Sequence, residues 1–318
     1  MIIISDLAGF MPDQNFQSAV AIGKFDGIHR GHQALLQDLK NAVRDSKVPL
    51  KSVVFTFEPS PEYFFSKGRV KCLMTAREKR EVFEKTGIDV LVEFPFNEET
   101  AGMDPRDFIR DILGGRLRAK CISGGEDLTF GKGGRGTMQL LKEESGEFGF
   151  LVRCVGKVSY GGSPVSSTRI REAIADGKLS EAAKMLGRPF GFTGPVIHGR
   201  HLASKMHMPT MNQAIEDEKF LPPFGVYYSE TRICGRIMPS ITNIGIKPTI
   251  TDEHRPLAET YVYGMDEDVY GQEAEVGLLE FRRAEQKYGS VEELSRTLQE
   301  DMEAGAQFHR DRNSTVLG

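Results

Sequence analysis

Residues 23–32 read Gly23-Lys24-Phe25-Asp26-Gly27-Ile28-His29-Arg30-Gly31-His32. They follow a short apolar run at 18–22, typical of a buried strand, and lead into an amphipathic pattern at 32–43 that predicts a helix. The three glycines let the backbone approach a ligand closely, and the free N–H groups of a helix N-terminus favour anions. This stretch therefore predicts a phosphate-binding loop between a first strand and a first helix.

Two histidines of this stretch, His29 and His32, stand at the mouth of the predicted helix. Both could donate hydrogen bonds to phosphate oxygens and stabilise charge on a phosphorus transition state without a covalent nucleophile. The alternative is a glycine-rich turn with two surface histidines. The ten-residue context in the first strand-to-helix turn favours the phosphate site.

The pattern of residues around this loop predicts an α/β domain with a mostly parallel sheet covered on both faces. Short apolar runs alternate with amphipathic stretches, and ligands in such sheets bind beyond the carboxyl ends of the strands. Further strands are expected at 52–57, 89–94, 119–123 and 150–155, and helices at 76–85, 105–113 and 137–144.

Two helices expected at 166–176 and 180–186 close the first half of the chain. The second half has a different pattern, with β-rich segments at 194–198, 226–231, 242–246, 258–264 and 273–281. Proline, glycine and charged turns separate the β segments, which predicts a small antiparallel β-barrel. A terminal helix is expected at 290–302, and the tail at 308–318 is expected to be polar and frayed. We place the domain boundary so that residues 1–187 and 188–318 form the two domains.

Composition excludes several classes of protein. The 318 residues are about twice a typical domain, and 39% hydrophobic with 27% charged residues is ordinary for a globular protein. With 41 basic and 45 acidic residues the net charge is −4, which argues against nucleic-acid binding. No apolar run is long enough to span a bilayer, and the N-terminus does not resemble a signal peptide. Four widely spaced cysteines indicate reduced thiols in a cytoplasmic protein.

Three further stretches point to the same ligand. Ser166-Ser167-Thr168-Arg169 opens a predicted helix, where hydroxyls, a helix N-terminus and an arginine suit a triphosphate, although an N-cap with solvated arginines is the simpler alternative. A glycine-rich loop at 124–136 follows a strand, and it carries charged side chains near the expected ligand face. The segment at 55–61 is stiffened by two prolines and offers aromatic surface to a flat ligand.

These four stretches, in this order, resemble the adenylyltransferase half of bacterial bifunctional riboflavin kinase/FAD synthetases. That family belongs to the HxGH nucleotidyltransferases, which have a Rossmann-like domain. The resemblance implies that FMN phosphate attacks the α-phosphorus of Mg²⁺·ATP and releases pyrophosphate. Ser60 and Leu128 depart from the pattern, since the family usually has a histidine and an aromatic residue there.

The same resemblance assigns residues to ligands. It implies that His29 and His32 are catalytic and contact the ATP phosphates. It further implies that Ser167, Thr168 and Arg169 hold the β- and γ-phosphates, and that Arg169 is catalytic too. The remaining ATP-binding positions are Gly23, Phe25, Asp26, Gly27 and Gly31. The flavin-binding positions are Phe57, Pro59, Pro61 and Asp127.

The second half resembles the riboflavin kinase module of the same family. Spacing alone could not single out Glu259 among 45 acidic residues, but the resemblance implies that it activates the ribityl 5′-hydroxyl of riboflavin. Thr210 and Asn212 are implied to bind ATP and to hold Mg²⁺ through their oxygens. Departures from the family pattern are Ala203 and His207 for glycines, Met211 for alanine and Lys247 for arginine.

Several alternatives stay open at this point. One is an FMN adenylyltransferase whose kinase barrel is impaired and acts as a flavin-binding or regulatory module. A transition-metal site at His198, His201 and His207 is conceivable but lacks a closed ligand set. An aminoacyl-tRNA synthetase would need a KMSKS-type partner motif and a basic surface. The expected ligands are riboflavin, FMN and ATP, with FMN and FAD as products, and neither nucleic acid nor membrane. The protein is expected to be a monomer or weak oligomer.

Overall fold

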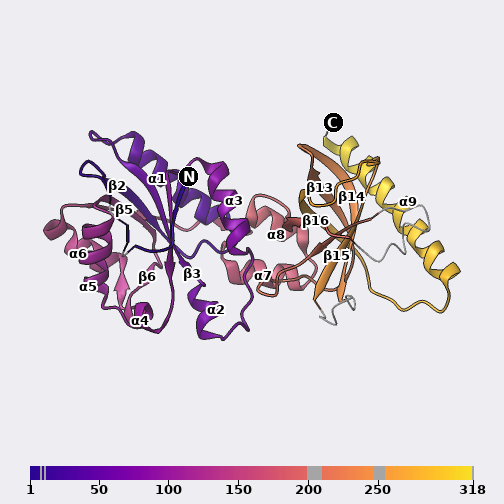
Figure 1. Cartoon of the computed structure of the whole chain (residues 1–318), viewed down its shortest axis with the longest axis horizontal. Coiled ribbons are helices and arrows are strands. Elements are labelled where there is room, and N and C mark those ends of the chain that lie inside the picture. Colours follow the sequence, from indigo (N-terminus) through magenta and orange to yellow (C-terminus); the bar gives the residue numbers. More distant parts are fainter. Residues whose placement is uncertain (8, 11, 199–209, 247–254, 317–318) are drawn as a thin grey trace. The chain divides into compact units, whose positions relative to one another are not determined.

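The computed structural model describes residues 1–7, 9–10, 12–198, 210–246 and 255–316. The chain divides into two compact units, Met1–Ser167 and Thr168–Gly318 (Figure 1). The helices predicted at 166–176 and 180–186 are α7 (Ser167–Ala175) and α8 (Leu179–Leu186), and both fall almost wholly in the second unit. The division at 187/188 expected from sequence stays a prediction.

The first unit is built on a six-stranded sheet in which every neighbouring pair is parallel. Its order is β1-β4-β3-β2-β5-β8. The strands are β1 (Ile2–Ile4), β2 (Ser18–Ile22), β3 (Lys51–Glu58), β4 (Val90–Pro95), β5 (Ala119–Gly125) and β8 (Leu151–Val155). The chain moves from β2 outward to β4 and then returns to β5 on the other side of β2. The carboxyl ends of β2 and β5 therefore flank the point where ligands bind in such sheets.

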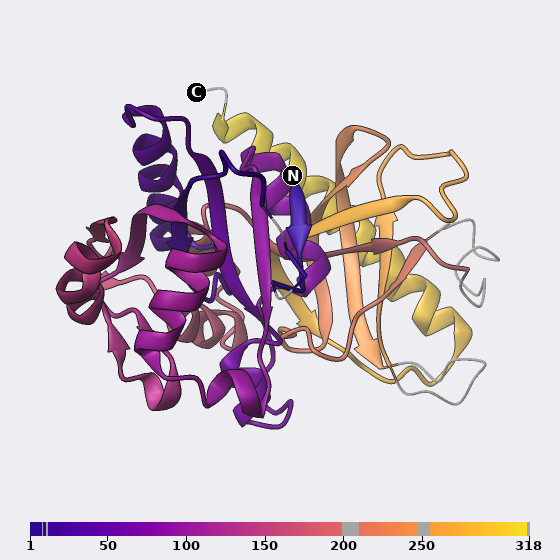
Figure 2. The ribbon, with the colours of Figure 1, turned by 60° about the vertical axis from the view of Figure 1, so that its left-hand side comes forward.

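Helices cover both faces of this sheet, and two hydrophobic cores result (Figures 1 and 2). On one face α1 (Arg30–Arg44) and α3 (Ala76–Thr86) bury Leu39 and Phe83 against the strands. On the other, α6 (Met138–Phe148) and the π-helical segment Phe108–Arg116 bury Leu141 and Ile109. The short elements of this unit are α2 (Pro61–Phe65), α4 (Glu98–Ala101), α5 (Pro105–Asp107), β6 (Thr129–Phe130), the 3-10 turn Lys132–Gly134, β7 (Gly136–Thr137), β9 (Ser159–Tyr160) and β10 (Ser163–Pro164).

The second unit contains a six-stranded antiparallel sheet in the order β11-β16-β13-β14-β15-β12. The strands are β11 (Phe190–Pro195), β12 (Met211–Ala214), β13 (Gly225–Ile233), β14 (Arg236–Ile246), β15 (Pro256–Val262) and β16 (Glu273–Ala284). The Gln213 amide on β12 donates 2.8 Å hydrogen bonds to the carbonyls of Gly194 and Ala274, so the two edge strands meet. The predicted combination of parallel sheet and antiparallel barrel is confirmed.

The terminal helix α9 (Val291–Val316) is longer than expected, and the prediction of a frayed tail at 308–318 is wrong for residues 308–316. The ring of Phe308 stacks on that of Tyr228 with centroids 4.3 Å apart. His309 is buried, and its Nε2 lies 3.0 Å from the Ser240 carbonyl. The last turns therefore stay helical because their aromatic side chains pack on the barrel.

Candidate active sites

The two histidines meet at the start of α1, directly after β2. His29 is the N-cap of this helix, with extended backbone, and its Nδ1 accepts a 3.3 Å hydrogen bond from the backbone N–H of His32. The two rings stack with centroids 3.8 Å apart and planes 14° from parallel. The juxtaposition expected from sequence is thus present at the helix N-terminus, where anions are favoured.

The environment of His32 keeps its imidazole neutral at pH 7. Burial lowers the pKa of His32 well below its ordinary value, and repulsion from His29 lowers it further. Among the residues that the structure describes, its Nδ1 is one of two buried side-chain polar atoms with no hydrogen-bond partner. A neutral imidazole carries one N–H, so His32 can act as a hydrogen-bond donor without bringing a positive charge.

The loop before α1 is held in an unusual backbone conformation. Phe25 and Ile28 have φ angles of 51° and 40°, a region that L-residues other than asparagine and aspartate rarely adopt, yet both side chains are almost fully buried. Gly27 has φ 82°, and a Cβ at Gly31 would lie 3.1 Å from the His29 ring. Gly27 is therefore needed for the loop to adopt this shape, and Gly31 leaves room for the His29 ring.

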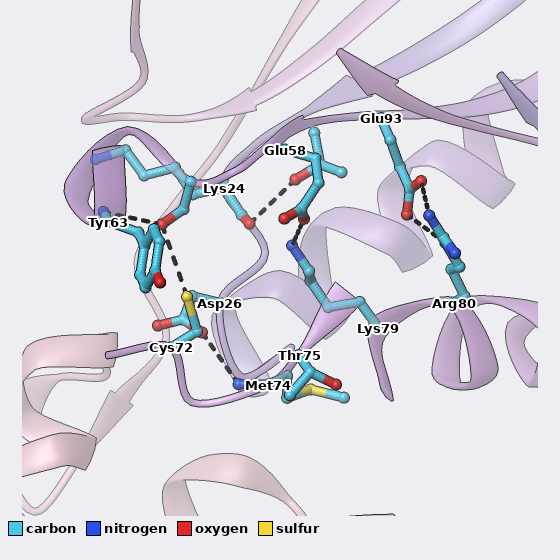
Figure 3. Close-up of polar contacts among 12 residues, drawn as sticks. Lys24, Asp26, Glu58, Tyr63, Cys72, Met74, Thr75, Lys79, Arg80 and Glu93 are labelled. Carbon is cyan, nitrogen blue, oxygen red and sulfur yellow. Dashed lines mark hydrogen bonds and ion pairs between the residues drawn. The ribbon is translucent and has the colours of Figure 1, made fainter. Parts of the chain in front are cut away.

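Asp26 ties this loop to the segment before α3. Its Oδ1 accepts hydrogen bonds from the backbone N–H groups of Leu73 and Met74, at 2.8 and 3.3 Å (Figure 3). Its carbonyl accepts a 2.9 Å bond from the Ser167 hydroxyl. The carboxylate is thus an anchor for neighbouring backbone, and its contact with ATP, expected from the family resemblance, stays a prediction.

The hydroxyl-rich motif begins α7. The Ser167 hydroxyl donates a hydrogen bond to the Asp26 carbonyl, so Ser167 lies against the loop before α1. Thr168 and Arg169 belong to the second unit, where Thr168 is exposed and the Arg169 guanidinium lies 3.5 Å from the Glu181 carboxylate. The contacts of these two residues with ATP stay predictions.

The proline-containing loop after β3 leads into α2. Ser60, which replaces the histidine usual in the family, is the N-cap of α2 and accepts a 3.3 Å hydrogen bond from the Tyr63 N–H. Pro59 and Pro61 flank it, and Pro61 occupies the first turn of the helix, as its fixed φ allows. Serine therefore suits this position as a cap.

An aromatic cluster lies beside this loop. Phe57, Phe96 and Phe64 form edge-to-face ring pairs at 5.7 and 5.5 Å, and Phe65 packs on both Phe64 and Phe96. Phe65 is 65% exposed, so this apolar ring is open to solvent. Sequence reasoning missed Phe65, although its place four residues after Pro61, inside a short aromatic run, was a usable signal.

The loop after β5 carries Asp127 and Leu128. The Asp127 carboxylate is exposed and forms a 3.1 Å ion pair with Lys157. Leu128, in place of the usual aromatic residue, packs against the hydrophobic core of the unit. A Cβ at Gly124 would lie only 2.7 Å from Leu128, so this side chain fills the space above the end of β5.

The pairing of the barrel strands brings together the residues expected to form the kinase site. Asn212 pairs with Glu259 across β12 and β15, and Glu259 pairs with Asn243 across β15 and β14. Directly opposed residues in antiparallel strands point to the same face. Asn212, Glu259 and Asn243 therefore lie in one row over three strands. Asn243 was not among the expected site residues.

Thr210 lies immediately before β12, next to this row. The Asn212 side-chain amide donates a 3.4 Å hydrogen bond to the Thr210 carbonyl, which leaves the amide oxygen as the acceptor end. Asn212 is buried and Glu259 half-buried. Amide, hydroxyl and carboxylate oxygens are ligands that Mg²⁺ accepts, so the donor set fits this ion.

Some residues singled out by the sequence lie outside the described part of the chain, namely Ala203, His207, His201 and Lys247. Met211 is buried and pairs with Thr260 across the strands. The His198 ring stacks on that of Tyr270, with the ring centroids 3.8 Å apart.

Within the described ranges no group of three or more His, Cys, Asp or Glu side chains could hold a metal ion. Nor does any helix there combine the length and apolar character needed to cross a membrane.

Comparison with known proteins agrees with this geometry. A family model described as FAD synthetase matches residues 11–169, and one described as riboflavin kinase matches residues 186–309. The bifunctional riboflavin kinase/FMN adenylyltransferase of Escherichia coli K12 is 34% identical to this chain over 291 residues, and that of Haemophilus influenzae is 33% identical over 291 residues. These alignments cover 91% of this chain and 92% and 94% of the relatives. A solved Streptococcus pneumoniae structure, described as a macrolide-efflux protein, is 29% identical with a TM-score of 0.77 and covers 96% of this chain and 98% of its own.

Proposed function

The chain belongs to the family of bifunctional riboflavin kinase/FMN adenylyltransferases, and from this membership we propose how its two sites divide the work. The protein phosphorylates riboflavin with ATP to give FMN and then transfers AMP from ATP to FMN, which yields FAD and pyrophosphate. The observation that carries the proposal is that both family models match, one on each half of the chain.

In the first unit, we propose that ATP binds over the N-terminus of α1. An oxygen of the FMN phosphate attacks the α-phosphorus of ATP, and the bond from that phosphorus to the β-phosphate bridging oxygen breaks. His29 and His32 donate hydrogen bonds to phosphate oxygens as negative charge builds up, and the helix N-terminus adds free N–H groups. No covalent nucleophile is needed, because FMN itself supplies the attacking oxygen. Ser167, Thr168 and Arg169 bind the departing phosphates.

The flavin site of this unit is proposed at the 57–61 loop. Phe57, Pro59 and Pro61 provide a stiff apolar wall, and Asp127 lies on the loop after β5. Exposed Phe65 adds an aromatic face on which a flat ring system can stack. Support comes from the aromatic cluster that holds Phe65 in place beside the loop.

In the second unit, we propose that Glu259 is the general base for the riboflavin 5′-hydroxyl. The hydroxyl oxygen then attacks the γ-phosphorus of ATP, and ADP leaves. Thr210 and Asn212 would hold Mg²⁺ with ATP, and when bound the ion neutralises charge on the phosphates. The strand register supports this assignment because it sets Asn212 beside Glu259.

A chromatographic assay tests the proposal. The purified protein is supplied with Mg²⁺ and ATP and, in parallel, with riboflavin or with FMN. We expect FMN and FAD from riboflavin, and FAD from FMN. FAD from FMN alone, with riboflavin unchanged, would contradict the kinase assignment and favour an impaired barrel.

Location and assembly complete the proposal. All four cysteines are free thiols, which is typical of a cytoplasmic protein, and we propose that compartment. We further propose that the protein works as a monomer or weak oligomer, with riboflavin, FMN and ATP as ligands and without nucleic acid or membrane. The acidic net charge of −4 supports the exclusion of nucleic acid.

A further inference from the structure

We propose that Lys79 is a positioning residue for FMN adenylylation. Its buried ammonium fixes Glu58, the last residue of β3, and through Glu58 it sets the 57–61 loop that receives the flavin. This inference rests on the proposed function of the first unit.

The contact itself is short and largely buried. Lys79 Nζ lies 2.9 Å from Glu58 Oε2, and the side chains are 6% and 31% exposed (Figure 3). A lysine this deeply buried is costly unless its charge is paired, and removing one partner leaves the other charge uncompensated. The pair therefore holds the end of β3 in one place.

The same end of α3 also contacts the loop before α1, which contains Asp26 and is expected to bind ATP. The backbone N–H groups of Leu73 and Met74, just before the helix, donate to Asp26. Thr75 and Glu78 close the helix start with a reciprocal capping box. The segment 73–79 thus contacts both the loop expected to bind ATP and Glu58 of the 57–61 loop.

A neighbouring ion pair provides a matched comparison. Arg80 donates to both carboxylate oxygens of Glu93 at 2.8 and 2.6 Å (Figure 3). Glu93 is inside β4 and is 3% exposed, so this pair also fastens α3 to the sheet. Neither partner of this pair is in the 57–61 loop, although the Arg80 charge also interacts electrostatically with the Glu58 carboxylate. If fastening the helix were all that mattered, losing either pair would have the same effect on catalysis.

The experiment compares Lys79→Met with Arg80→Met. The steady-state KM for FMN and kcat are measured for FMN-to-FAD conversion, and FMN binding is followed by quenching of flavin fluorescence. We expect Lys79→Met to raise the KM for FMN about ten- to a hundredfold, since misplacing a substrate-binding group costs this much. Arg80→Met should stay within about twofold in KM. Riboflavin phosphorylation by the second unit should be unchanged in both.

Two further variants keep the test decisive if Lys79→Met folds poorly. Lys79→Arg keeps a cation beside Glu58 and should retain most of the FMN affinity. The double variant Glu58→Gln/Lys79→Met has no buried charge and should fold, yet its KM for FMN should remain raised because the loop is no longer fixed. A merely structural role predicts that the double variant recovers the wild-type KM.

A wild-type KM in Lys79→Met or in the double variant would overturn the inference, as would equal increases in Lys79→Met and Arg80→Met. If the wild-type chain itself makes no FAD from FMN, the proposed function fails and the inference fails with it. If the wild-type chain makes FAD but the variants behave as just described, only the inference fails, so the two failures are distinguishable.

Discussion

His29 shows at the residue scale how one side chain can serve the fold and, as we propose, the chemistry as well. It caps α1 through Nδ1, and its ring packs on His32. We expect His29→Ala to abolish FAD formation from FMN, because a phosphate donor is lost, while FMN still forms from riboflavin. The lost cap should cost about 1 kcal/mol of stability. Both products are measured by chromatography in one reaction.

The control for His29→Ala is Thr137→Ala, since Thr137 caps α6 by the same kind of bond to the Leu140 N–H at 3.3 Å. It should lose similar stability and keep both activities. If His29→Ala, properly folded, also stopped FMN formation, the assignment of this loop to adenylyl transfer would be wrong.

Glu259 is the corresponding residue of the barrel. We expect Glu259→Gln to stop FMN formation from riboflavin and to spare FMN-to-FAD conversion, because the amide cannot accept the hydroxyl proton. Glu275→Gln is the matched control, since Glu275 lies on another strand of the same barrel and pairs with Arg232 at 3.4 Å. Turnover of riboflavin by Glu259→Gln at the wild-type rate would rule out Glu259 as the base.

At the scale of the element, α9 depends on tertiary contacts with the barrel. The Asp301 side chain is 4% exposed, and its carboxylate accepts hydrogen bonds from Arg282 and Arg283 of β16. The shortest nitrogen–oxygen distance is 2.6 Å for each arginine. We expect Asp301→Asn to lower the stability of the second unit by about 3 kcal/mol, as for a broken buried ion pair. Calorimetry should show a lower transition temperature for this unit, with the first unit unchanged.

Asp311→Asn on the same helix provides the comparison, because Asp311 is exposed and its carboxylate accepts a hydrogen bond from the Gln307 amide at the surface. It should change the stability by less than about 0.5 kcal/mol. Equal effects of the two substitutions would mean that the buried ion pairs do not hold α9 on the barrel.

At the scale of the whole molecule, each unit has a described histidine, His32 or His309, whose pKa is lowered by burial and whose titration therefore affects folding. Burial lowers the pKa of His32, with repulsion from His29 adding to it. Burial likewise lowers the pKa of His309, opposed by the Ser240 carbonyl and Glu230 and reinforced by Arg312. Below a pH of about 6.5 the unfolded chain therefore binds more protons than the folded one.

Both units should thus lose stability as the pH falls below about 6.5, by up to about 1.4 kcal/mol per pH unit for each histidine. Hydrogen exchange between pH 7.5 and 5.5 can follow β3 and β14 separately. His32→Gln should flatten the pH dependence of the first unit only, and His309→Gln that of the second only. An unchanged slope in either variant would show that its histidine is not responsible.

Much of this arrangement was predictable from sequence because it depends on local patterns. The run at 18–22 became β2 with the same bounds, and the histidine-containing loop leads into α1 as expected. The barrel was predictable as a class because its short strands are separated by turn residues. By contrast, β1 and the π-helical form of 108–116 have no distinct local signal, and the length of α9 depends on the packing of Phe308 and His309.

The sequence by itself determined the two classes of fold and the residue types at each proposed phosphate site, since glycines, histidines and helix caps act through near neighbours in the chain. Only the tertiary structure decided which distant residues act together. It joined Asp26 to residues 73–74, Lys79 to Glu58, and Asn212 to Glu259 and Asn243. These contacts depend on strand register and helix packing, which are set by burial over the whole unit and not by any local pattern.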